Sequence, residues 1–308
     1  MTHSFDLKQL VSPIPVIDFI QERLSKKPFF ISRQNSNYYD DLLPLSEFRR
    51  YFERHDLLYP TVRLVKDGKN IPAKDFSNSF RFGPDHSGSY VDQKRLFDYF
   101  NDGYTITLSS LELSLDPIRR FAVSLYNELK GKVGVTAFYT PKGTQSLGPH
   151  YDYMDVFVVQ LYGSKTWKIY DSPVYLPTEF HYHDVSSEPV LLEKELLPGD
   201  LLYFPRGFVH ETNTTTQDSL SLSIGFEPFL YRDLLSLVLE NCTAFDEFSS
   251  FRDRCNIEDE FGAKDMLLTA FYDFVNSLPA GYFQKAFDDK FKARFLSSYN
   301  DFHSNLFH

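Results

Sequence analysis

Three side chains that lie far apart in the sequence have the types and the spacing of a metal site. His150 and Asp152 stand two residues apart, after Gly148 and Pro149. Residues two apart on an extended strand share a face, so this imidazole and this carboxylate would point the same way. His210 follows much later, at a separation that suits a strand brought back by a sheet. We expect the three to converge on one metal ion.

The ligand types indicate which metal this would be. Two histidines and one carboxylate occupy one face of a metal and leave other positions open, which is the arrangement of non-haem Fe(II) oxygenases. Structural zinc favours cysteine and closes its coordination shell. A His-x-Asp pair alone is weak, because two polar residues hydrogen-bonded in a sheet give the same pattern. Here the later histidine follows a Pro-Gly-Asp strand start and a Pro-Arg-Gly turn. The set therefore predicts an iron- and 2-oxoglutarate-dependent oxygenase.

Strands must position these ligands, and strand patterns fill the sequence from about residue 133. Alternation and turn signals predict strands at 134–140, 156–161, 166–170, 201–204 and 219–226. In the last of these, Leu220, Leu222 and Ile224 would face a packed layer. The small residues on the other face would leave room for a ligand: Ser219, Ser221, Ser223 and Gly225. Antiparallel strands at this density predict a double-stranded β-helix, the jelly roll of cupin type.

Helical and mixed elements are expected on both sides of this core. Before it we expect helices at 16–24, 45–52, 93–101 and 116–130, strands at 27–31, 58–65 and 105–108, and a polar loop at 73–92. After it the spacing is helical, at 231–240, 263–276 and 283–298. The fold class is thus mainly β with α. Residues 1–230 would form one domain, with its core at about 130–228, and residues 231–308 a helical appendage that is a candidate dimerisation element.

Composition narrows the class of partner. Of the 308 residues, 42% are hydrophobic and 24% are charged, which suffices for a substantial core. The formal net charge of −10 gives no electrostatic footprint for nucleic-acid phosphates. No apolar run reaches the length of a membrane span, and the N-terminus has no signal-peptide pattern. Only Cys242 and Cys255 occur, without a disulfide framework or zinc motif, so we expect a cytoplasmic protein.

Lys165 is the second candidate binding residue. It begins the strand that follows the hairpin signal Tyr162-Gly163-Ser164-Lys165. If its side chain points inward, the ammonium could pair with the distal carboxylate of 2-oxoglutarate, strengthened by exclusion of water. Composition alone favours the alternative, a solvated lysine on a hairpin.

Two long blocks of sequence resemble the JmjC-type ribosomal oxygenases of the cupin superfamily. The first runs from Tyr139 to Trp167 and the second from Leu197 to His210, and their order and spacing also fit. Weaker likeness extends the resemblance to roughly residues 15–230. It implies Fe(II) held by His150, Asp152 and His210, with O2 as oxidant. It also implies that a basic residue fifteen positions after the first ligand, here Lys165, binds 2-oxoglutarate.

The chain departs from the family on the strand that precedes the metal motif. Members with protein substrates often carry Asn and Tyr there, whereas this chain has Thr136 and Phe138. Thr136 can still donate a hydrogen bond, but Phe138 cannot. Ser221 and Ser223, from the opposite strand, are the nearest replacements. We therefore expect Thr136, Ser221 and Ser223 to complete the co-substrate pocket.

Several interpretations stay open from the sequence. The segment from Ser172 to Pro189 is a substrate-reading lid beside the iron, an exposed loop, or a second metal site through His181 and His183. The resemblance implies hydroxylation of an amino-acid side chain in a protein. The alternatives are the same chemistry on a peptide or small molecule, and a cupin that binds metal without catalysis. Fold analogy does not identify the substrate.

Overall fold

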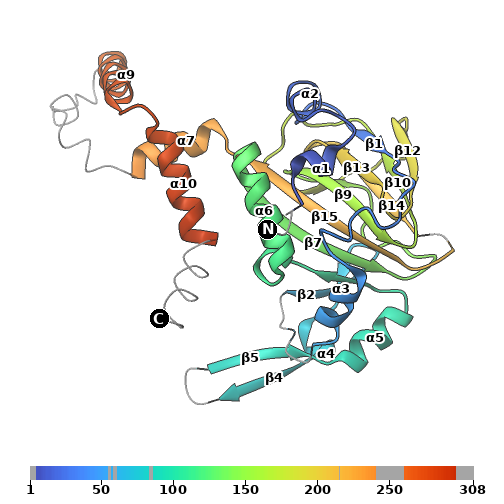
Figure 1. Ribbon diagram of the computed structural model, residues 1–308. Helices are drawn as coiled ribbons and strands as arrows, with labels where there is room; N and C mark the ends of the chain where they lie inside the picture. The colour runs from blue at the N-terminus through green and yellow to red at the C-terminus, as the bar shows by residue number, and fades with distance from the viewer. Residues whose placement is uncertain are drawn as a thin grey trace. The chain divides into compact units, whose positions relative to one another are not determined.

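The computed structural model describes residues 5–54, 57, 61–82, 86–214, 216–240 and 260–295. The chain divides into two compact units, Met1–Pro228 and Phe229–His308. All described strands belong to the first unit, and the described residues of the second are helical apart from short connections (Figure 1). The division falls two residues before the boundary that the sequence suggests.

Two antiparallel sheets build the first unit. The larger contains, in spatial order, β1 (Phe29–Ile31), β13 (Leu201–Phe204), β9 (Asp155–Tyr162), β15 (Ser219–Pro228), β7 (Gly131–Thr140), β6 (Thr105–Leu108), β2 (Val62–Lys66) and β3 (Lys69–Asn70). The smaller contains β11 (His181–Tyr182), β8 (His150–Tyr151), β14 (His210–Asn213), β10 (Lys165–Ile169) and β12 (Leu192–Leu196). Strands distant in the sequence are neighbours in both sheets, which confirms the expected double-stranded β-helix of the cupin type.

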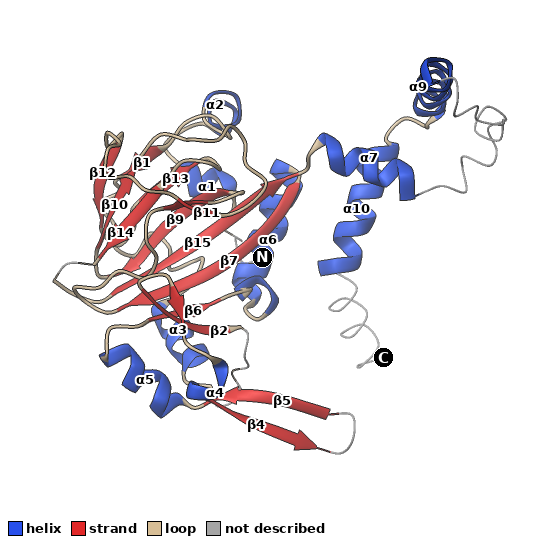
Figure 2. Cartoon of the chain, turned by 180° about the vertical axis from the view of Figure 1, so that it is seen from behind, coloured by secondary structure: helices blue, strands red, loops and turns tan. Residues whose placement is uncertain are grey.

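The outer face of the larger sheet packs against helices. Alternation on β15 turns Leu220, Leu222 and Ile224 into the core that also holds Phe121 and Leu125 of α6 (Asp116–Leu129). Figures 1 and 2 both show α6 beside β7 and β15. This is the packed layer that the leucine and isoleucine spacing predicts.

The inner face of the larger sheet meets the smaller sheet through a second apolar core. On β9, Phe157 and Val159 belong to the outer core, whereas Val156 and Val158 belong to the inner one. The inner core also contains Trp167 of β10. A strand buried on both faces reads as a continuous apolar run, and β9 is such a strand.

Short helices precede the main strands, and their apolar residues extend the outer core. They are α1 (Leu7–Val11), α2 (Val16–Glu22), α3 (Leu45–Phe52), α4 (Ala73–Phe76), α5 (Gln93–Asn101) and the 3-10 turn η1 (Leu111–Leu113). Phe19 of α2 packs edge-on against Tyr203 of β13, with ring centroids 5.4 Å apart. This contact joins the N-terminal helices to the larger sheet.

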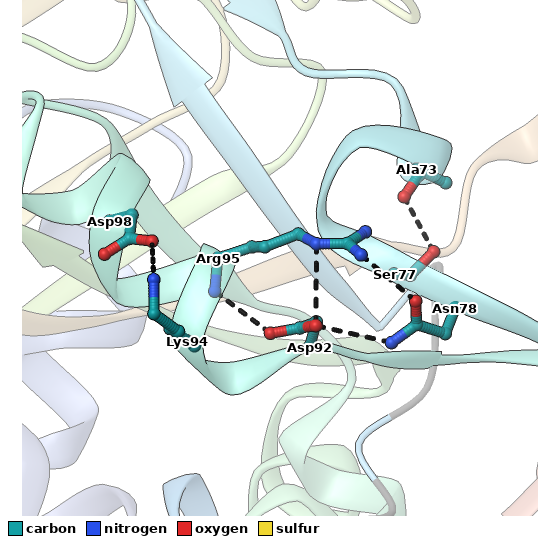
Figure 3. A network of polar contacts seen from close by, with 7 residues as sticks. All are labelled: Ala73, Ser77, Asn78, Asp92, Lys94, Arg95 and Asp98. Carbon is teal, nitrogen blue, oxygen red and sulfur yellow. Dashed lines mark hydrogen bonds and ion pairs between the residues drawn. The ribbon is translucent and has the colours of Figure 1, made fainter.

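The expectation of a polar loop at 73–92 is wrong. This segment forms α4 and a separate two-stranded hairpin of β4 (Ser77–Phe82) and β5 (His86–Val91). Figure 3 shows how the base of this hairpin is connected to α5. Asp92 caps the helix by accepting a hydrogen bond from the Arg95 amide at 3.1 Å. The side chain of Asn78 donates to the Asp92 carboxylate and accepts from the Arg95 guanidinium. Ser79 is exposed on this two-stranded ribbon, and an exposed ribbon needs no apolar alternation, so the polar pattern that suggests a loop is compatible with strands.

The second unit contains α7 (Tyr231–Glu240), α9 (Glu260–Ser277) and α10 (Tyr282–Phe295). Each of the three expected C-terminal helices is present, although residues 296–298 lie outside the described residues, as do Cys242 and Cys255. No helix among the described residues combines the length and apolar character needed to cross a membrane.

The strand boundaries near the ligands differ from the expectation in one respect. The long strands are close to their predicted ranges, and strands are present at His150 (β8) and His210 (β14) as expected, but β11 and β12 were not predicted. Each is short or polar, so its pattern is weak. β8 ends at Tyr151, so Asp152 follows the strand instead of lying on it.

Candidate metal centre and cavity

The smaller sheet brings the three expected ligands together. β8 and β14 are adjacent, and their register sets His150 directly opposite His210, with ring centroids 4.2 Å apart. Asp152 follows β8, and its Oδ2 lies 3.7 Å from His210 Nε2. One ligand atom from each of the three falls within 4.8 Å of the others, which fits a single metal ion.

The backbone orients both imidazoles. His150 Nδ1 lies 2.8 Å from the Gly148 carbonyl, and His210 Nδ1 lies 3.2 Å from the Phe208 carbonyl. A carbonyl oxygen only accepts, so each Nδ1 carries the hydrogen and each Nε2 keeps a free lone pair. Metal-binding histidines are held in this way by a hydrogen bond from the other ring nitrogen.

Burial sets the charge states that such a site needs. Desolvation, with a smaller contribution from His150, lowers the pKa of His210 well below its ordinary value, so this imidazole is neutral at pH 7. Burial raises the pKa of the Asp152 carboxyl, and the attraction of His150 opposes it. A divalent cation reverses this balance, because it stabilises the carboxylate. The neutral imidazole of His210, the second imidazole of His150 and one carboxylate are a ligand set that fits Fe(II).

The three residues line a cavity of about 570 Å³ between the two sheets. Its walls come from β7, β9 and β15 of the larger sheet and from β8, β10 and β14 of the smaller. Both apolar and polar side chains line it, as in most small-molecule sites. This volume exceeds the needs of one metal ion and admits a further small ligand.

Lys165 points into the protein and not into solvent. It is 2% exposed, lines the cavity, and donates from Nζ to Thr140 Oγ1 at 2.9 Å. Thr140 in turn accepts from Thr105 Oγ1 at 3.3 Å. Desolvation lowers the pKa of Lys165 to about 7, and no carboxylate among the described residues lies within ion-pairing distance. The interpretation as a solvated hairpin lysine is therefore wrong, and the buried ammonium calls for an anionic ligand.

The remaining expected co-substrate residues also reach the cavity. Thr136, Ser221 and Ser223 all line it, together with Phe138. The register between β7 and β15 pairs Ser221 with Phe138 and Ser223 with Thr136. Ser221 is 1% exposed and its Oγ has no hydrogen-bond partner among the described residues. A buried hydroxyl without a partner is costly, so a ligand bond to Ser221 fits.

Several cavity residues were not identified from the sequence, and three of them are Trp167, Phe180 and Tyr182. Trp167 lines the cavity, and its Nε1 has no partner among the described residues. Phe180 and Tyr182 place their rings 4.9 Å and 6.1 Å from the His150 ring. Strand alternation after Lys165 points to Trp167, whereas nothing local in the sequence predicts the other two contacts.

The segment from Ser172 to Pro189 therefore contributes to the cavity wall. Its alternative role as a second metal site has no support in the part of the chain that is described. There, His150, Asp152 and His210 form the one group of three metal-ligating side chains, and His181 and His183 belong to no such group. His181 instead lies 3.7 Å from Glu179, and His183 lies 3.8 Å from Glu188.

The fold and the site together define a class. Residues 115–234 match the JmjC domain model, and this range contains all three ligands and Lys165. Residues 115–234 are therefore a JmjC domain, within a fold of the cupin type. Its fold matches the X-ray structure of E. coli ycfD with a TM-score of 0.56, covering 87% of this chain and 69% of that one at 19% identity. A further structure of that ribosomal oxygenase contains cobalt and 2-oxoglutarate, with a TM-score of 0.55 at 19% identity.

Among proteins of known name, the chain is similar to the ribosomal oxygenases. It is 31% identical over 208 residues to ribosomal oxygenase 1 of Danio rerio, covering 66% of this chain and 36% of the relative. It is 30% identical over 248 residues to ribosomal oxygenase 2 of Mus musculus, covering 77% and 50%. It is also 27% identical over 242 residues to the bifunctional lysine-specific demethylase and histidyl-hydroxylase NO66 of Aedes aegypti, covering 76% and 37%. The chain thus spans half or less of these three relatives.

Proposed function

We propose that the chain is an Fe(II)- and 2-oxoglutarate-dependent hydroxylase that acts on an amino-acid side chain in a protein. One observation carries the proposal. Three ligand atoms of the right types lie within 4.8 Å of one another, in a cavity that also holds a buried lysine without a carboxylate partner among the described residues. The name histidyl-hydroxylase of one relative supports hydroxylation of an amino-acid side chain, and the name ribosomal oxygenase of another supports a substrate in the ribosome.

Each cavity residue has a role in this proposal. His150, Asp152 and His210 would hold Fe(II), and Lys165 would bind the distal carboxylate of 2-oxoglutarate. When bound, the metal and 2-oxoglutarate supply the activation of O2 and the oxidising power for hydroxylation of a C–H bond. Thr140 holds the Lys165 ammonium in place, and the apolar walls exclude water from the charged groups. Ser221, Ser223 and Thr136 would complete the co-substrate pocket.

A cytoplasmic location and a homodimer through residues 231–308 complete the proposal. The first rests on cysteine usage and the second on the helical character of that region. Sedimentation of the full chain tests the second directly.

The decisive experiment follows succinate and oxygen insertion together. The full chain is incubated with Fe(II), 2-oxoglutarate and O2, with and without ribosomal proteins, and succinate is measured by NMR. Mass spectrometry then seeks the addition of one oxygen atom to a protein. We expect succinate from the wild type and none from Asp152→Ala. Asp98→Ala, an exposed aspartate on α5, is the matched control and keeps full activity.

Each contrary result has a definite meaning. Equal succinate from wild type and Asp152→Ala refutes the assignment of this ligand. Succinate that only a small molecule stimulates assigns the chemistry to a different substrate class. Metal binding, measured by calorimetry with Mn(II), without any succinate, indicates a cupin that binds metal but does not catalyse.

A further inference from the structure

The strand beside the metal ligands lies at an open edge of the smaller sheet. β11 is the outermost strand of that sheet, next to β8, and no described strand lies on its other side. Both of its side chains are exposed, Tyr182 by 54% and His181 by 57%. An open edge presents backbone groups on which another extended chain can pair.

The register shows which backbone groups are free. His181 pairs with Tyr151, and the His183 amide donates to the Pro149 carbonyl at 3.0 Å. Residues of an antiparallel ladder alternate between facing their partner and facing away. Because His181 and His183 face β8, the N–H and C=O of Tyr182 between them face the open edge. They form a donor and acceptor pair for a strand from outside.

This edge is adjacent to the candidate reaction centre. Tyr182 pairs with His150 across the two strands, and Tyr182 and Phe180 both line the cavity. A strand added to β11 would lie two strand spacings from β8, roughly 10 Å. Its side chains on the face shared with Tyr182 would then point toward the cavity mouth. The location suits the part of a polypeptide that flanks a modified residue.

The charge around the edge selects the occupant. We call residues 172–191 the lip; it contains Glu179, Asp184 and Glu188 but no lysine or arginine. The side chain of Glu179 is 80% exposed and that of Glu188 is 41% exposed. The hydrogen bond that Asp184 accepts from the backbone amide of Ser186 lowers the pKa of its carboxyl, which keeps the carboxylate charged. Exposed rings accompany them, with Tyr175 at 89% and Phe180 at 38%. Carboxylates and aromatic faces together favour arginine and lysine side chains.

We propose that the open edge of β11, with the surrounding lip, docks an extended arginine- or lysine-bearing segment of the polypeptide substrate by strand addition. This proposal rests on the proposed function in one respect, that the docked polypeptide is the substrate. The docking itself can be measured without turnover. Main-chain bonds to Tyr182 would supply sequence-independent binding, and the lip carboxylates would supply the preference for positive charge.

Peptide binding tests the docking mode. The probe is a short fluorescent peptide of alternating arginine and threonine, titrated with the full chain and followed by anisotropy. The same peptide with every amide nitrogen methylated keeps its charge but cannot donate to a strand edge. A peptide with glutamate in place of arginine reverses the charge. We expect binding of the first peptide only.

Charge reversal on the protein tests the place of docking. Glu179→Lys with Glu188→Lys reverses two lip charges and leaves Asp184, which accepts from the Ser186 amide, in place. The matched control is Glu193→Lys with Glu195→Lys, two exposed residues on β12 at the opposite edge of the same sheet. We expect the lip variant to lose about tenfold in affinity and the control less than about twofold.

The outcomes separate this proposal from the proposed function. Equal affinity for the methylated peptide, or an equal loss in the two charge variants, overturns docking at β11. Absence of peptide binding, with self-association that the lip variant alters, assigns the edge to a second copy and also overturns it. Failure of the oxygenase proposal appears elsewhere, as absence of succinate from the wild type, whatever the peptide affinities are.

Discussion

The two sheets of the first unit use their side chains differently. The larger sheet buries apolar residues on both faces, outward against α6 and inward against the smaller sheet. The smaller sheet directs the side chains of His150, His210 and Lys165 into the cavity. Its outer face carries polar residues such as Lys168 and Glu211. Stability should therefore depend most on the larger sheet, and ligand binding on the smaller.

The largest effect on stability is expected in the larger sheet. Phe157 is fully buried on β9 and packs on Tyr203 with ring centroids 4.8 Å apart. Phe157→Ala should lower the free energy of unfolding by about 4 kcal/mol, through lost burial and a cavity. Urea denaturation measures it. Phe80→Ala, at a ring that is 43% exposed on β4, is the matched control and should cost less than about 1 kcal/mol. Similar losses in both would contradict the dependence of stability on the core of the larger sheet.

The smaller sheet should show the opposite behaviour at Lys165. Lys165→Met keeps the length of the side chain but removes the ammonium, so affinity for 2-oxoglutarate should fall about a hundredfold, near 3 kcal/mol. The free energy of unfolding should stay equal or rise, because a buried charge is removed. Calorimetry and denaturation measure the two quantities. Lys168→Met, on the outer face of the same strand β10, should change neither. Unchanged co-substrate affinity in Lys165→Met would remove this lysine from the site.

The pH dependence of the same lysine sharpens the contrast. Burial lowers the pKa of Lys165 to about 7 from 10.5. Between these values the unfolded chain binds more protons here than the folded chain, so the free energy of unfolding should rise with pH, by up to ~1.4 kcal/mol per pH unit. Affinity for 2-oxoglutarate should fall over the same range, because the ammonium is lost. The difference between wild type and Lys165→Met, measured against pH, isolates the contribution of this lysine to the free energy of unfolding and to the affinity for 2-oxoglutarate. A difference that does not change with pH would contradict the lowered pKa of this buried lysine.

The smallest effect is expected where the larger sheet itself reaches the cavity. Ser221→Ala removes a hydroxyl that has no partner among the described residues, so stability should not fall. Affinity for 2-oxoglutarate should weaken by roughly fivefold, about 1 kcal/mol, if this hydroxyl bonds the ligand. Ser79→Ala on the exposed hairpin should change neither quantity. Equal co-substrate affinity in all three proteins would leave Ser221 without a binding role.

Much of the fold could be predicted because its long strands have strong patterns. The Leu220, Leu222 and Ile224 spacing indicates both the buried face and the small-residue face of β15, and both are found, although Ser219 accepts from Gln160 and does not line the cavity. The hairpin of β4 and β5 could not be predicted, because its residues are polar and its stability comes from bonds such as those of Asn78 to α5. A two-residue strand such as β11 leaves too little pattern to detect.

The candidate site was predictable for its ligand types and, through the resemblance, for the cavity position of Lys165, Thr136, Ser221 and Ser223, but not for the contacts that hold these residues. The spacing of His150, Asp152 and His210 indicates the group, because chemistry restricts which residues can bind iron. The burial of Lys165, its bond to Thr140 and the approach of Phe180 to His150 depend on chain segments that meet only in three dimensions. No local rule connects residues so far apart.

The carbonyls that hold the two imidazoles have one further consequence. In each case the acceptor belongs to the residue two positions before the histidine, Gly148 for His150 and Phe208 for His210. Every amino acid carries a main-chain oxygen, so no single substitution at either position deletes it. Both rings are therefore locked in one tautomer by the polypeptide itself, and neighbouring side chains can diverge without disturbing where the ring protons sit.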